Sequence, residues 1–159
     1  MGKQARAIVE ISLKDLVRDL NKAYCDEWLA YYLYWYMAQT VSGRSYEDMA
    51  EILKKLAEDE KEHATELADL ILKLGGVPIA NPSDWEKNAN APYIMPPKNT
   101  SDINRIIRIV LDAEAQAIEV YNNLAKRLFG KDHLSYQLIT HILGEEVEHE
   151  EMFENLAER

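Results

Sequence analysis

The chain has 159 residues, of which 28 are acidic and 18 basic, giving a formal net charge of −10. This length suits one domain with a sizeable core, and 47% hydrophobic with 29% charged residues is typical of a globular protein. The composition argues against a membrane helix, against binding to DNA, which needs Lys and Arg, and, with Cys25 as the single cysteine, against an intrachain disulfide.

Four segments are expected to form long helices. All five prolines lie between positions 78 and 97, so nothing outside that window interrupts a helix. Ser12 and Ser45 are expected to cap the first two helices and Gly43 to stop the first, while the third helix is expected to start near Thr100 or Ser101. Apolar residues recur at helical spacing over four ranges: 12–41, 46–74, 101–129 and 133–158.

The connections between these helices predict their topology. The first and last connections are short, so each joins an antiparallel hairpin. The middle connection, 75–99, can extend to about 80 Å, whereas a helix of about 30 residues spans roughly 45 Å. This linker, in which 83–87 is expected to form a short helix, can therefore cross the whole molecule. The sequence predicts a single all-α domain over 1–159, a four-helix bundle with one long crossover.

Each apolar stripe contains polar residues near its middle. Because residues three or four apart share a helix face, each Glu-x-x-His pair projects to one side. Four buried carboxylates would repel one another, and the stripes hold no Lys or Arg there, whereas two divalent ions would balance them. Oxygen and imidazole donors suit iron or manganese, and zinc also binds them. The six predicted metal ligands are Glu27, Glu60, His63, Glu114, Glu146 and His149.

The pattern repeats in the two halves of the chain, which predicts a site with approximate twofold symmetry. Tyr34 and Tyr121 each follow a predicted ligand by seven residues, and we expect both to hydrogen-bond the ligands. Acidic residues off the stripes, including Asp59 and Glu145, are interpreted mostly as solvated surface, although some could line a cage interior or an iron-entry pore. His141 is off the ligand register and is assigned no role.

On these residues the chain resembles the ferritin-like superfamily, and within it the Dps-like, bacterioferritin-related subclass. The turn at 129–132 and the segment at 91–97 also look like that subclass. The resemblance implies a ferritin-like bundle that acts as a cytoplasmic ferroxidase. It would bind two iron ions per chain and oxidise Fe(II) with hydrogen peroxide or O2, for iron storage and protection from oxidative stress in a homo-oligomeric cage.

Some family features are missing. Lys61 stands where bacterioferritins carry the haem-binding methionine, so haem is not expected, and the cysteine pair of some members is absent from 88–93 and 121–127. The chain ends ten residues after His149, which leaves no room for the fifth helix of 24-subunit ferritins and favours a dodecamer.

Two alternative functions remain open for the same sequence. The six ligands would also serve a di-metal peroxidase, a manganese catalase or an oxygenase, because a fold and a ligand set do not fix the reaction. A metal-free interaction bundle is the third hypothesis. It predicts that a chelator leaves folding untouched and that replacing the four glutamates stabilises the protein.

Overall fold

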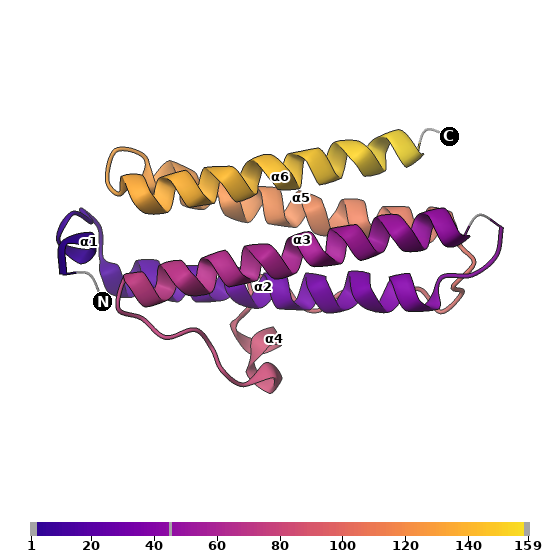
Figure 1. Ribbon diagram of the computed structural model, residues 1–159, viewed down its shortest axis with the longest axis horizontal. Coiled ribbons are helices and arrows are strands. Elements are labelled where there is room, and N and C mark those ends of the chain that lie inside the picture. The colour runs from indigo at the N-terminus through magenta and orange to yellow at the C-terminus, as the bar shows by residue number, and fades with distance from the viewer. Residues whose placement is uncertain (1–2, 45, 158–159) are drawn as a thin grey trace.

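The computed structural model describes residues 3–44 and 46–157, and these form an all-helical chain (Figure 1). Within the described residues, no helix is both long enough and apolar enough to cross a membrane. The elements are α1 (Lys3–Ala7), α2 (Leu13–Thr40), α3 (Tyr46–Lys73), the 3-10 turn η1 (Pro82–Asp84), α4 (Trp85–Asn88), α5 (Ile103–Leu128) and α6 (His133–Ala157).

The ends of the long helices lie within two residues of the predicted ranges, apart from position 158, which is outside the described residues. Ser12 caps α2, since its hydroxyl accepts a hydrogen bond from the backbone N–H of Asp15 at 3.3 Å. Gly43 ends the first hairpin's turn with φ +92°, a conformation that favours glycine. The cap predicted at Ser45 also lies outside the described residues.

The start predicted for the third long helix is wrong by one or two residues. Asp102 caps α5, because its carboxylate accepts a hydrogen bond from the backbone N–H of Arg105 at 2.9 Å. The Thr100 carbonyl instead accepts from the backbone N–H of Ser42 at 3.0 Å. Asp satisfies the free amide groups of a first helical turn at least as well as Ser or Thr does, which explains the later start.

The four long helices form two antiparallel hairpins, α2 with α3 and α5 with α6, packed side by side (Figure 1). The bond between Ser42 and Thr100 places the end of the linker beside the start of α3, so α3 and α5 run parallel after a full crossover. On its way the linker packs α4 against α2. Trp85 stacks on Trp28 there, with ring centroids 5.3 Å apart.

The buried apolar residues form two separate clusters along the bundle. Leu33, Met37 and Phe153 belong to the cluster nearer the α2–α3 turn, and Leu16 and Ile142 belong to the cluster nearer the α5–α6 turn. Between the two clusters, each of the four long helices contributes a buried glutamate, and α3 and α6 each add a buried histidine. The fold therefore places a polar layer in the middle of an otherwise apolar core.

Candidate metal centre

All six predicted ligands lie in this central layer. The four carboxyl-bearing residues are at most 3% exposed, and the two histidines at most 7%. Each lies near the middle of a long helix, on the apolar face that packs toward the inside of the bundle. One glutamate comes from each helix, and α3 and α6 add one imidazole each, one turn after their glutamate.

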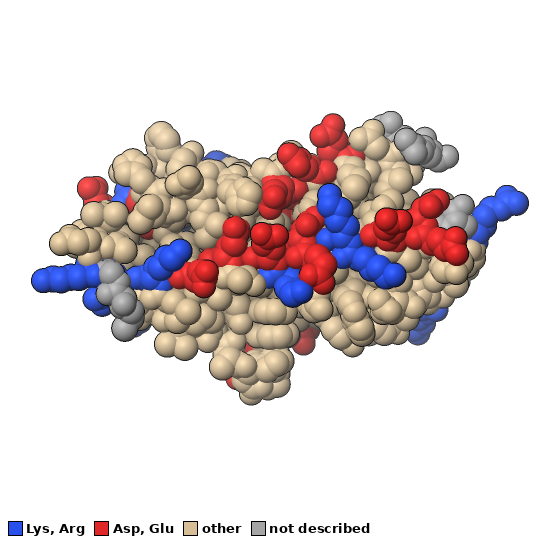
Figure 2. Space-filling view, viewed as in Figure 1, with Lys and Arg blue, Asp and Glu red and all other residues tan. Residues whose placement is uncertain are grey.

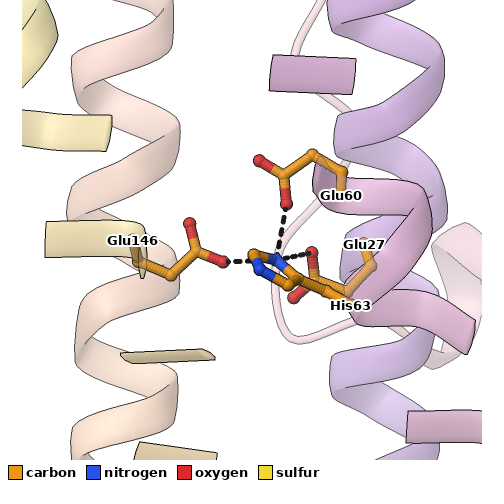
Figure 3. A group of neighbouring side chains, drawn as sticks. All are labelled: Glu27, Glu60, His63 and Glu146. Atoms are coloured by element: carbon orange, nitrogen blue, oxygen red, sulfur yellow. Dashed lines mark hydrogen bonds and ion pairs between the residues drawn. The ribbon is translucent and has the colours of Figure 1, made fainter. Parts of the chain in front are cut away.

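The first cluster surrounds the inward nitrogen of His63 (Figure 3). The His63 Nδ1 atom lies 3.2 Å from Glu60 Oε2 and 3.2 Å from Glu146 Oε1. Glu27 Oε2 lies 3.7 Å from the same nitrogen. One donor atom of each of these four residues falls within 4.8 Å of all the others, close enough for the four to hold one metal ion.

The second cluster repeats this arrangement around His149. Its Nδ1 atom lies 3.6 Å from Glu146 Oε2 and 3.9 Å from Glu60 Oε1, with Glu114 Oε2 at 3.7 Å. Glu60 and Glu146 therefore belong to both clusters, and each turns one oxygen toward each imidazole. Two carboxylates shared in this way could serve two neighbouring ions.

The two tyrosines singled out by their spacing cross between the hairpins. The hydroxyl of Tyr34, on α2, donates to Glu114 Oε1 on α5 at 2.6 Å. The hydroxyl of Tyr121, on α5, donates to Glu27 Oε1 on α2. Each tyrosine thus fixes the carboxylate that belongs to only one cluster, and each does so on the opposite helix.

Asp59 and Glu145 are partly exposed, as expected for surface residues, but each also contacts a histidine of the centre. Glu145 Oε2 lies 2.8 Å from Nε2 of His63, and Asp59 Oδ2 lies 3.4 Å from Nε2 of His149. Each carboxylate thus contacts the outward nitrogen of the imidazole on the other helix, α6 to α3 and α3 to α6. Such contacts fix the imidazole orientation and leave Nδ1 for a metal. His141 also lies near this face, with Nε2 3.7 Å from Glu145.

Known proteins place this arrangement in a family. A family model described as a ferritin-like domain matches residues 17–159. The chain belongs to the ferritin-like family. A DNA protection during starvation protein (Dps) of Pyrococcus furiosus is 31% identical over 159 residues, covering 98% of this chain and 85% of that protein.

Solved structures with the same fold include Dps and bacterioferritin-related proteins. The bacterioferritin-related protein of Bacteroides fragilis, described as a dodecameric thioferritin, is 33% identical with a TM-score of 0.91, covering 97% of this chain and 92% of that one. Dps of Thermosynechococcus elongatus is 18% identical with a TM-score of 0.82, covering 91% of each chain, and shares the fold. This ferritin-like chain is therefore a Dps-like, bacterioferritin-related four-helix bundle.

Burial and crowding of the carboxylates shift the pKa values of the ferritin-like centre. Burial raises the pKa of Glu60 well above its usual range, with Glu146 and Glu27 adding to the rise, and raises that of Glu114 to about 8. Burial alone would lower the pKa of both histidines. The nearby carboxylates outweigh it, raising the pKa of His149 to about 10 and that of His63 as well. The same imidazoles hold the pKa of Glu146 down to about 2 despite its burial.

Several buried polar atoms at the centre have no hydrogen-bond partner. They include Oε2 of Glu114, both carboxyl oxygens of Glu146 and Nδ1 of His149. A buried polar atom without a partner is costly. The described residues include no buried Lys or Arg to neutralise the cluster. Two divalent ions would satisfy these atoms and balance four carboxylates, so the residues fit a pair of metal ions.

Glu145 and Asp59, the outer carboxylates, each contact the outward nitrogen of one histidine, and removing either is expected to weaken metal binding at one position. Losing a group that orients a ligand histidine typically costs about 10–100-fold in metal affinity. We expect Glu145→Ala to weaken the position beside His63, and Asp59→Ala the position beside His149. Competition titration of Co(II) against a chelating dye measures this, with Glu148→Ala, an exposed position on α6, as the control. Equal affinities in all four proteins would show that the outer carboxylates have no orienting role.

Metal binding is also expected to release protons. Because the raised pKa values keep protons on Glu114 and both histidines at neutral pH, divalent ions must displace these protons to bind. The release should shrink as the pH rises through about 8 and about 10, where Glu114 and His149 lose their protons without metal. Calorimetry of Zn(II) binding in buffers of different ionisation enthalpy measures it, and a pH-independent release would contradict these shifts.

Proposed function

We propose that this ferritin-like protein is a ferroxidase that binds two Fe(II) ions per chain, oxidises them and stores the product inside a homo-oligomeric cage. The observation that carries the proposal is the pair of clusters that share Glu60 and Glu146. Sharing would bring two cations side by side in a buried site, where a two-electron oxidant could meet both. Membership of a family that includes Dps proteins supports the same role.

The six ligands would have three different roles. Glu60 and Glu146 would hold both ions, and Glu27 and Glu114, each fixed by a tyrosine hydroxyl, would hold one ion each. The histidines supply one neutral donor to each ion through Nδ1. Their outward nitrogens are held by carboxylates, which keeps the imidazole rings from turning.

The overall reaction is balanced for either oxidant. Two Fe(II) ions give up one electron each. Hydrogen peroxide accepts these two electrons with two protons and leaves as two molecules of water, whereas O2 accepts them with two protons and leaves as hydrogen peroxide. The protein supplies ligand geometry and a site shielded from bulk water, and the metal pair supplies the redox chemistry. Removing Fe(II) and peroxide together is a means of protection from oxidative stress.

Iron is the proposed metal, although the donor set would also accept manganese or zinc. A dodecameric cage is the proposed assembly, as in the related protein of Bacteroides fragilis. We propose that protection works through iron chemistry and without DNA binding, because the net charge of −10 opposes contact with phosphates. Haem has no part in the proposed reaction.

Anaerobic loading followed by oxidation tests the proposal. We expect the protein loaded with two Fe(II) per chain to oxidise them rapidly when hydrogen peroxide or O2 is added. We expect Glu60→Ala to abolish this rapid oxidation. Glu62→Ala, an exposed position on the same helix, is the matched control. Turnover of peroxide by manganese-loaded protein, with no oxidation of Fe(II), would favour a manganese catalase and contradict the ferroxidase.

A further inference from the structure

A cavity of about 80 Å³ leads from the linker to the carboxylates of the candidate centre. It lies between α2, α5 and linker residues 90–94, and all four glutamates line its inner end, whereas neither histidine does. We propose that this cavity is the binding and entry site of the small, uncharged oxidant. The proposal rests on the proposed function and adds a route for the second substrate.

The walls of the cavity suit an uncharged molecule. Between the linker and the carboxylates they are made largely of small and aliphatic side chains, among them Ala30, Leu33, Ala113 and Ala117. A hydrated cation would have to shed its water against these side chains, which is costly, whereas O2 or un-ionised hydrogen peroxide loses little. A water-sized molecule needs only about 10–15 Å³ of such space, so the cavity holds several atoms.

The opposite side of the centre has the chemistry that cations need. There the imidazoles are backed by Asp59 and Glu145, whose side chains are 32% and 41% exposed. Acidic side chains gather over the middle of the face that carries α3 (Figure 2). The centre therefore has an acidic side, reached past the histidines, and an apolar side, reached past the alanines. Two substrates of different charge can approach from different sides.

The linker is fixed where it covers the cavity. The Asp26 carboxylate accepts hydrogen bonds from the backbone N–H of Asn90 at 2.8 Å and from that of Ala91 at 3.4 Å. Glu86 accepts another from the backbone N–H of Tyr93 at 3.3 Å. The bonds to Asp26 hold the linker over α2, and the bond to Glu86 ties the linker to its own helix α4. The small Ala30 and Ala117 side chains beneath it keep the passage open.

Substitutions that fill the passage should slow access of the oxidant without changing metal binding, so the two effects can be measured separately. Ala117→Leu adds three carbon atoms to the cavity wall without replacing a ligand, and Ala117→Val adds two. Ala115→Leu makes the same change at an exposed position on α5 and is the matched control. Three quantities are measured on each assembled protein: xenon uptake, anaerobic Co(II) affinity, and the rate of Fe(II) oxidation by O2 and, separately, by hydrogen peroxide.

We expect the wild type and Ala115→Leu to take up xenon, a probe of apolar cavities. Ala117→Leu should lose xenon, keep its Co(II) affinity and oxidise Fe(II) at least about tenfold more slowly, with Ala117→Val in between. A slower reaction with only one of the two oxidants assigns the route to that oxidant.

Unchanged oxidation by both oxidants in an Ala117→Leu protein that excludes xenon would overturn the entry proposal and leave the ferroxidase intact. A wild type that takes up xenon but oxidises no Fe(II) would overturn the proposed function and the entry proposal with it. If Ala117→Leu does not assemble, Ala117→Val decides the question by the same two readouts.

Discussion

Anaerobic titration is expected to give two Co(II) per chain for the wild type, one for Glu27→Gln and one for Glu114→Gln. Each of these two glutamates belongs to a single cluster, the first with His63 and the second with His149. Gln keeps the shape of the side chain and removes its charge, so one position should lose its ion while the other is kept.

Glu60→Gln and Glu146→Gln should behave differently, because both carboxylates belong to both clusters. We expect either substitution to weaken both positions by about a hundredfold or more, above the cost of losing a group behind a ligand. The visible absorption of bound Co(II) reports stoichiometry and affinity together, with Glu62→Gln as the exposed control on α3. Loss of only one ion in Glu60→Gln would rule out bridging, as would loss of both in Glu27→Gln.

The second large effect is on thermal stability. An ion that binds only the folded chain contributes about 4 kcal/mol when present at about a thousand times its Kd, and two ions contribute about twice that. For a chain of this size each kcal/mol raises Tm by about 2–4 °C, so saturation with Co(II) should raise Tm by about 15–30 °C. A chelator should reverse the rise. Calorimetry in metal and in chelator measures the difference.

The presence or absence of this rise in Tm distinguishes a metal-binding centre from a metal-free bundle. If the centre binds no metal, Tm is the same with Co(II) and with chelator. The protein with Glu27, Glu60, Glu114 and Glu146 all replaced by Gln is the control. It should show no response to Co(II), so any response that it does show comes from ions bound elsewhere.

The six central residues could be predicted from the sequence because a helix repeats its faces at a fixed period. Once Glu60 is placed on the apolar stripe of α3, His63 must share its face, and the same rule applies to Glu146 and His149. Proline-free stretches and a long proline-rich linker predict the two hairpins and the crossover in the same way. These are properties of single helices and of chain lengths, which need no knowledge of packing.

Contacts between helices were harder to predict. Tyr34 follows Glu27 on the same helix, yet its hydroxyl reaches Glu114 on α5, because the hairpins face each other across the centre. Asp59 and Glu145 lie off the apolar stripes, and only the approach of α3 to α6 brings them to the imidazoles. One signal for them was present: each directly precedes the glutamate of a Glu-x-x-His pair, in both halves of the chain.

The cavity has no sequence signal of that kind. Ala30 and Ala117 fit an apolar stripe as well as any alanine does, and nothing in their spacing marks them as walls of a passage. The passage depends on where the linker lies, and that is determined by its hydrogen bonds to Asp26. Such a feature is found only once the linker is placed over α2.

A crystal structure of the protein soaked anaerobically with Fe(II), with anomalous scattering recorded at the iron edge, tests the central claim most directly. We expect two iron peaks per chain, one at Nδ1 of His63 and one at Nδ1 of His149, with Glu60 and Glu146 bound to both. A single peak, or peaks outside the layer between the two apolar clusters, would contradict the account.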